Sequence, residues 1–432
     1  VISVQQSKWG VRGSCNVLVI GKRPFRMIDM SILGLDMQIA AMLGFVGLEY
    51  WLGRDLLEGP VRKVVVTLVL IVFVFRIVQG CIGVGPGMQG PTRTKRTEVG
   101  STALWEWASS EMQGWRASME DAMSILCELP EPLSSQALFA VFDGHGGAKV
   151  SSVASMELPK VIAAEATSLL SKQTQQSSEE EAGKVTTSII EKALHLSMLS
   201  LDAALRKGGE EGSSHALAPP LAPWLPASPS KCANAFSLMG STAIIAVVDC
   251  GEESRQRGMP RRLTVANCGD SRAILCRRGK CVDLSEDHKP ERPCEEDRIR
   301  RAGGHVARVG VCHRIDGCGL NLSRALGDFH YKARDDLPPD QQKVIAVPEI
   351  LTLELTEEDE FLVLACDGIF ELMSSQKVID TVRRGFREGL SSEKVVEHLV
   401  DSACSRNLIQ TRGRGGDNCS AIVVRFRHDA PS

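Results

Sequence analysis

The sequence lacks several features that would assign it quickly to a broad class. Its 432 residues carry 50 Lys and Arg against 53 Asp and Glu, so the formal charge of −3 provides no basic field for nucleic acid. The 14 cysteines include no Cys-x-x-Cys pair, which disfavours a zinc site and indicates reduced thiols. With 43% hydrophobic residues, we expect a globular protein of the cytosol or nucleus that does not bind nucleic acid.

The chain also lacks an apolar run long enough to cross a bilayer. The run from Val64 to Phe75 is shorter than the roughly 20 residues that a membrane helix needs. Extending it to Ile82 would bury Arg76, at a cost of roughly 2.5 to 3.5 kcal/mol. We interpret residues 1–87 as an uncertain leader, either a gene-model extension ahead of a start near Met88 or a poorly ordered segment. A membrane anchor through 64–82 is the alternative.

Hydrophobic patterning predicts a mixed fold of strands and helices. Short runs rich in Val, Ile and Leu predict strands at 137–142, 242–248, 263–266, 361–366 and 421–425. Helical patterning and helix-boundary residues predict helices at 186–206, 293–302, 374–388 and 392–404. Because the two types do not alternate strictly, layered sheets covered by helices fit better than a doubly wound sheet. We place this α+β domain at 100–427, with a low-complexity insertion at 207–231.

Aspartates beside glycine stand near the ends of several predicted strands. Asp143 and Asp367 directly follow strands, Asp270 follows another closely, and Asp417 precedes the last. One such pair is ordinary turn chemistry, but repetition predicts that the acids gather at one rim of a sheet, where they would repel one another without cations. The segment 114–121 adds an arginine and two more acids.

These residue types predict chemistry on a phosphate. Oxygen ligands select hard cations such as Mg²⁺ or Mn²⁺. Two such ions about 4 Å apart would deprotonate a water and orient a phosphate for in-line displacement. An arginine fork suits a phosphate, and a histidine beside a metal-bound aspartate can protonate the departing oxygen.

At these residues the chain resembles the metal-dependent type 2C (PPM) serine/threonine protein phosphatases. The matching stretches occur in family order: MQGWRASMEDA (112–122), FAVFDGHGG (139–147), GSTA (240–243), ANCGDSRA (266–273), LSEDHKP (284–290), RIRRAGGHV (298–306), LSRALGD (322–328), VPEI (347–350), LACDGIF (364–370) and GGDN (415–418). The resemblance implies a four-layer α-β-β-α sandwich of two antiparallel sheets flanked by helices. It also implies hydrolysis of phosphoserine and phosphothreonine by a water or hydroxide bridging two Mn²⁺ or Mg²⁺ ions.

The resemblance implies a role for each matching residue. In the first metal site, Asp143 bridges both ions, Gly144 offers its carbonyl, and Asp367 and Asp417 complete the ligands. Glu120, with Asp121 nearby, would hold the water molecules bound to the second ion. Arg116 would bind the substrate phosphate, and His145 would act as the general acid.

A weaker third metal site in the family has an uncertain counterpart in this chain. Asp270 matches one of its ligands, but Glu371 stands where the family usually has an aspartate. The extra methylene moves the carboxylate, so the resemblance leaves this site open.

Two other functions remain as alternatives. A catalytically silent phosphoprotein-binding scaffold of the same fold usually loses a metal aspartate or the phosphate arginine, which this chain keeps. A two-metal nuclease would need a basic groove that the charge balance does not indicate. We expect a monomer that acts on phosphoproteins.

Overall fold

The computed structural model describes residues 90–174, 185–208 and 235–427, together with three short strands near the start of the chain. These strands, β1 (Ser3–Gln6), β2 (Asn16–Ile20) and β3 (Arg23–Arg26), form an antiparallel sheet of their own in a separate compact unit. The apolar stretch 64–82 and residues 209–231 of the predicted insertion lie outside the described residues. No helix in the described part of the chain is both long and apolar enough for a membrane span.

One antiparallel sheet of the larger unit has five strands. Its order is β17 (Glu349–Glu354), β11 (Arg262–Cys268), β10 (Ala243–Asp249), β7 (Gln136–Phe142) and β6 (Ala122–Leu126). Along β10, Ile244, Ala246 and Val248 face one core, while Ala243, Ile245 and Val247 face another. This alternation buries both faces of the sheet.

The second antiparallel sheet has six strands. Its order is β13 (Lys280–Asp283), β12 (Arg272–Arg277), β18 (Asp359–Ala365), β19 (Cys419–Phe426), β5 (Trp105–Gly114) and β4 (Thr92–Ser101). Its buried side chains share one core with the facing strands of the first sheet, where Trp105 meets Phe139 edge to face at 6.2 Å. The two sheets therefore form a sandwich.

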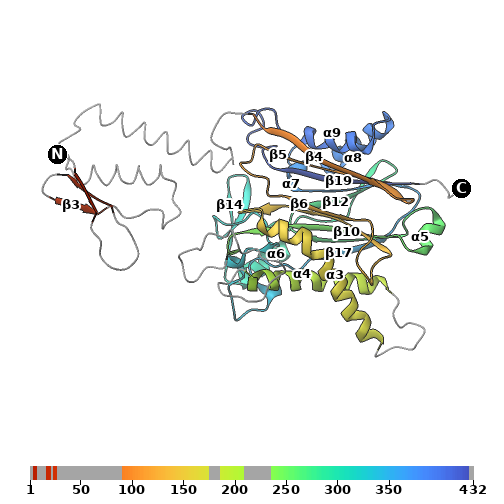
Figure 1. The fold of residues 1–432 in the computed structure, drawn as a ribbon, viewed down its shortest axis with the longest axis horizontal. Coiled ribbons are helices and arrows are strands. Elements are labelled where there is room, and N and C mark those ends of the chain that lie inside the picture. Colours follow the sequence, from red (N-terminus) through yellow and green to blue (C-terminus); the bar gives the residue numbers. More distant parts are fainter. Residues whose placement is uncertain are drawn as a thin grey trace. The chain divides into compact units, whose positions relative to one another are not determined.

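Helices cover the outer faces of both sheets (Figure 1). The five-stranded sheet carries α3 (Lys149–Thr174) and α4 (Thr187–Gly208), and the six-stranded sheet carries α8 (Ser375–Arg387) and α9 (Ser392–Ala403). Ser374 and Ser391 cap α8 and α9 by accepting hydrogen bonds from the backbone N–H groups of Lys377 and Lys394. The α-β-β-α sandwich predicted from the sequence is confirmed.

Short elements connect these layers. Outside the sandwich lie α5 (Glu252–Arg257), α6 (Pro293–Arg301), the hairpin β14 (Val306–Val309) and β15 (Cys312–Ile315), and the 3-10 turns η2 (Phe329–Lys332) and η3 (Pro339–Gln341). At one end of the sandwich lie α7 (Asp367–Phe370) and the small sheet of β8 (Gly144–His145), β9 (Gly240–Ser241) and β16 (Leu326–Gly327).

All five predicted strands and all four predicted helices are present, with bounds that differ by a few residues. Several further elements of the described chain were not predicted, among them one long strand and one long helix. The polar segment before residue 100 forms β4, so the sheet begins at Thr92, ahead of the predicted domain start. Residues 149–174 form α3, although Pro159 lies inside that helix.

Candidate metal centre

Strand ends bring four of the predicted aspartates together. Asp143 follows β7, Asp270 lies in the turn between β11 and β12, Asp367 opens α7 directly after β18, and Asp417 stands just before β19. Although they are far apart in the sequence, their carboxyl groups lie close together, since repulsion from Asp270 and Asp417 contributes to the raised pKa values of both Asp143 and Asp367. The predicted convergence at one rim is therefore what this fold produces.

Burial and mutual repulsion disfavour ionisation of this acidic cluster. Burial, followed by repulsion from Asp121, Asp367, Asp417 and Asp270, raises the pKa of Asp143 well above its usual range. The pKa of Asp121 rises to about 7, chiefly through burial, with repulsion from Asp417 opposing a hydrogen bond from Ser420. Several buried carboxylates can stay ionised side by side only when positive charge offsets their repulsion.

The donor set fits hard divalent cations. Oxygens of Asp121 and Asp143 and the Sγ atom of Cys366 all lie within 4.8 Å of one another. Burial raises the pKa of the Cys366 thiol well above its usual range, which keeps it neutral. Its sulfur also faces the carbonyl of Asn418 at 3.4 Å and the backbone N–H of Ser420 at 3.2 Å. The candidate ligands that are left, once the neutral thiol is excluded, are the carboxylate oxygens, which Mg²⁺ and Mn²⁺ prefer.

Arg116 lies at the rim of this cluster. Its Nη2 atom donates to Asp417 Oδ2 at 2.5 Å, while 47% of its side chain stays exposed. The preceding segment is fixed because Trp115 Nε1 donates to the carbonyl of Ser405 at 2.9 Å. Gly114 has φ +66°, and a side chain there would collide with the backbone of Asp417. The guanidinium is therefore anchored at one edge and open to solvent at the other.

Glu120 is held against the segment that follows Asp143. Its Oε2 atom accepts from the backbone N–H of Gly147 at 3.2 Å, and its Oε1 accepts from Ser118 Oγ at 2.9 Å. Its own N–H donates to Asn418 Oδ1 at 3.0 Å. A side chain at Gly144 would collide with the carbonyl of Glu120, so glycine permits this close approach.

His145 pairs with a residue to which the sequence analysis gave no role. Its Nε2 atom lies 2.7 Å from Oδ2 of Asp328, a carboxylate whose side chain is only 1% exposed. Burial lowers the pKa of His145, but Asp328 outweighs it and the net shift is upward. Asp328 ends the LSRALGD stretch and has φ +53°, an unusual conformation for a non-glycine residue. This pairing favours a protonated imidazole.

The two residues expected at a third metal site have protein partners instead. The ammonium group of Lys289 forms an ion pair with Asp270. The Oε2 atom of Glu371 accepts from the backbone N–H of Gly415 at 2.5 Å and of Gly416 at 3.3 Å. The glutamate thus ties down the loop before Asp417, and the predicted third site stays a prediction.

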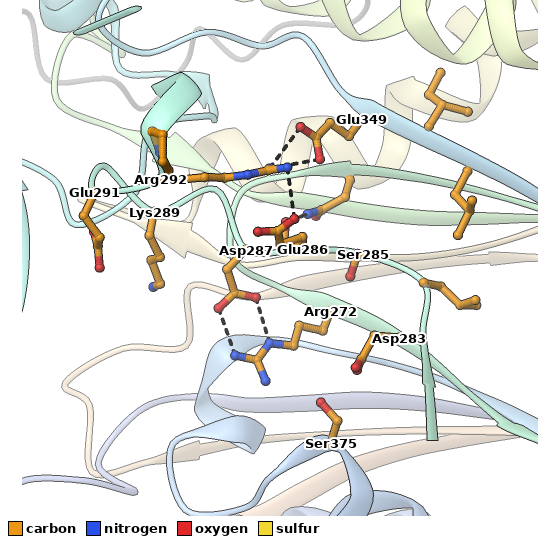
Figure 2. A pocket seen from close by; sticks show the side chains of 15 residues that line it. Arg272, Asp283, Ser285, Glu286, Asp287, Lys289, Glu291, Arg292, Glu349 and Ser375 are labelled. Carbon is orange, nitrogen blue, oxygen red and sulfur yellow. Dashed lines mark hydrogen bonds and ion pairs between the residues drawn. The ribbon is translucent and has the colours of Figure 1, made fainter. Parts of the chain in front are cut away.

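A polar groove of about 850 Å³ lies next to the acidic cluster (Figure 2). Lys289 connects the two, since it lines the groove and also contacts Asp270. Arg272 forms two hydrogen bonds to Asp287, at 2.7 and 2.9 Å. Arg292 bridges Glu349 and Glu286. These pairs neutralise much of the charge on the walls, and the groove provides hydrogen-bonding surface beside the centre.

Comparison with known proteins gives one consistent result. A family model described as protein phosphatase 2C matches residues 105–411. Probable protein phosphatase 2C 42 from Oryza sativa subsp. japonica is 32% identical over 79% of this chain and 90% of its own length. Probable protein phosphatase 2C 5 from Paramecium tetraurelia is 32% identical over 79% of this chain and 100% of its own. The crystal structure of a phosphatase from Toxoplasma gondii covers 78% of this chain and 97% of its own, with a TM-score of 0.55 and 27% identity.

Proposed function

The chain belongs to the protein phosphatase 2C family of metal-dependent serine/threonine protein phosphatases, and we propose that it works with two divalent cations, Mn²⁺ or Mg²⁺. The observation that carries this proposal is the crowding of buried carboxylates beside a half-exposed arginine. Carboxylates at such density need cations, and the arginine provides a partner for the phosphate of a substrate.

We assign the cations to the acidic cluster. Asp143 would contact both, the carbonyl of Gly144 with Asp367 and Asp417 would complete one site, and Glu120 with Asp121 would support the other. Bound there, the cations would lower the pKa of a water and neutralise charge that develops on the phosphoryl oxygens. The raised pKa values of Asp143 and Asp367 support this assignment, because each would return to its ionised form on binding a cation.

Arg116 would hold the substrate phosphate. Only one of its N–H groups is engaged by Asp417, and a guanidinium can donate two parallel hydrogen bonds to a tetrahedral anion. Asp417 thus fixes one edge of the guanidinium, and no other side chain in the described part of the chain accepts from its remaining donors. The role of this pair is to position the phosphoryl group over the cluster.

His145 would act as the general acid. Its imidazolium would donate a proton to the serine or threonine oxygen that leaves as the P–O bond breaks, so that the product is a neutral hydroxyl. Asp328 supports this role by stabilising the charged ring and fixing its orientation. Asp328 is a positioning residue, since it acts through His145.

The cellular setting is a separate part of the proposal. Every cysteine in the described part of the chain is free, which supports a reducing compartment such as the cytosol or nucleus. We also propose that the chain acts as a monomer.

Hydrolysis of a phosphothreonine peptide tests the proposed function. We expect turnover with Mn²⁺ or Mg²⁺, none after chelation, and a loss of at least about 100-fold in Asp367→Asn. The exposed Asp335 provides the matched control, and Asp335→Asn should keep full activity. Turnover that survives chelation, or equal rates in Asp367→Asn and the control, would refute the two-metal mechanism. A folded, metal-binding chain with no turnover on any phosphopeptide would favour the silent scaffold.

A further inference from the structure

A second pocket, at the other end of the six-stranded sheet, is rich in arginine. It has a volume of about 510 Å³, and its charged lining consists of Arg383, Arg387, Arg425, Arg427, Glu106 and Glu360. We call it the arginine pocket. Asp417 stands just before β19 and Arg427 directly after it, so the strand's eight residues separate the pocket from the acidic cluster by about 25 Å. In Figure 1 this end of β19 lies toward the C-terminus.

Two of the four arginines are already paired and fixed. Arg383 Nε donates to Glu360 Oε2 at 2.6 Å. Arg425 Nη1 donates to Glu106 Oε1 at 3.1 Å, and its guanidinium lies 4.5 Å from the centre of the Phe386 ring. These contacts make a rigid wall with little net charge.

The other two arginines carry the excess charge. Within the described residues, no acidic side chain forms an ion pair with Arg387, in the last turn of α8, or with Arg427. Both side chains are exposed at the pocket. Four arginines against two glutamates leave two positive charges in excess, and a phosphate monoester carries about −1.5 to −2 at neutral pH.

We propose that the arginine pocket binds a phosphate group on a phosphoprotein substrate, separate from the phosphate that is hydrolysed. Arginine forks match the geometry of a phosphate and donate charge-assisted hydrogen bonds to it. This inference rests on the proposed phosphatase function for the identity of the partner, but the pocket's affinity for a phosphate group does not depend on it.

The distance between the two sites limits which substrates can use both. An extended chain spans at most about 3.5 Å per residue, so two phosphates fewer than about eight residues apart cannot reach both sites. A longer flexible connection makes the second contact intramolecular, at an effective concentration that reaches about a millimolar. The pocket would therefore favour proteins with well-separated phosphorylated residues.

Two peptides test this inference in the Mn²⁺-loaded full chain. Each carries one phosphothreonine and one non-hydrolysable phosphonate, separated by 20 residues in the first and by 5 in the second. We expect the first peptide to have a KM roughly fivefold to tenfold lower than the second, at equal kcat. Arg387→Gln/Arg427→Gln should remove this difference without changing turnover of p-nitrophenyl phosphate. The exposed Arg308 of β14 lies outside the pocket, and Arg308→Gln, which removes one arginine charge there, should keep the difference.

A binding measurement separates this inference from the proposed catalytic function. Calorimetry uses the full chain with Arg116→Ala and without added Mn²⁺, so that the acidic cluster has neither its arginine nor cations to hold a phosphate, and titrates a single phosphonate peptide or inorganic phosphate. We expect the peptide to bind, and the double Gln variant to abolish this binding. Equal KM values for the two peptides, or binding that persists in the double variant, would overturn the inference. Inorganic phosphate binding as tightly as the peptide would overturn the assignment to a protein-borne phosphate.

Discussion

Replacing Glu295 with glutamine should destabilise the fold far more than removing an exposed carboxylate from the same helix, α6. Glu295 is 1% exposed, and its Oε1 atom accepts from Arg324 Nε at 3.0 Å and Nη2 at 2.6 Å. Its Oε2 accepts from Arg298 Nη1 and Ser323 Oγ, both at 2.6 Å. A glutamine amide would direct its own N–H donors at one of these donor sets, leaving a buried arginine without its acceptor.

The magnitude follows from the proton equilibrium of Glu295. Burial raises its pKa, but hydrogen bonds and charge from Arg324 and Arg298 lower it to about 2, from a reference value of 4.5. At about 1.4 kcal/mol for each pKa unit, the ionised form contributes roughly 3 kcal/mol to the free energy of unfolding. Loss of one partner of a buried pair costs about 3–5 kcal/mol, so we expect a loss in this range at pH 7.

The sign of the pH dependence is also fixed. Because the folded pKa lies below the unfolded one, this stability is complete above about pH 4.5 and is lost as the pH falls toward 2. We expect about 1 kcal/mol of it to be gone near pH 3.5 in the wild type. In Glu295→Gln this part of the pH dependence should be absent.

Urea unfolding at pH 7 and at lower pH measures both effects. Glu296 provides the matched control, since its i,i+4 pair with Arg300 lies at the surface and is worth about 0.5 kcal/mol or less. Equal unfolding free energies for Glu295→Gln and Glu296→Gln, or unchanged pH slopes, would refute the reasoning. The test bears on the site because the backbone N–H of Ser323 donates to the carbonyl of His288 at 2.9 Å, beside Lys289.

Three further predictions concern the site itself. Asp328→Asn should lower kcat by roughly 100-fold with little change in KM, because His145 loses the carboxylate that stabilises its protonated form. Steady-state kinetics measure this effect, and an unchanged kcat would contradict it. Arg116→Ala should raise the KM for a phosphopeptide at least tenfold, whereas Arg308→Ala should leave it unchanged. Saturating Mn²⁺ should raise the Tm of the wild type by several degrees, because cations offset repulsion within the acidic cluster. The same Mn²⁺ should raise the Tm of Asp143→Asn much less. Equal Tm shifts of the two proteins in a thermal scan would argue against that cluster as the metal site.

The sequence was most informative where a strand ends in a glycine-flanked acid. Asp143 and Asp367 were found because an apolar run predicts the strand and the acid marks its end. The strand order then brings the acids to one rim, since β7 and β11 both run antiparallel to β10, and the end of β18 lies beside the start of β19. Patterning predicted layered sheets covered by helices, and the family resemblance implied the sandwich. Local patterning was sufficient because these features lie within a few residues of one another.

Features that depend on distant contacts were not predictable in this way. The pairing of His145 with Asp328 joins residues 183 positions apart, and only the unusual backbone conformation of Asp328 marks it locally. Strand β4 was missed because its exposed polar side chains lack apolar alternation, and its order comes from pairing with β5. Helix α3 was missed because small alanine and serine side chains give it a weak apolar stripe.

Anomalous diffraction from crystals grown with Mn²⁺ tests the central claim most directly. The account predicts two strong anomalous peaks in the acidic cluster, both in contact with Asp143 and one also in contact with Asp367 and Asp417. A single peak, or peaks bound elsewhere while these carboxylates stay empty at saturating Mn²⁺, would contradict it.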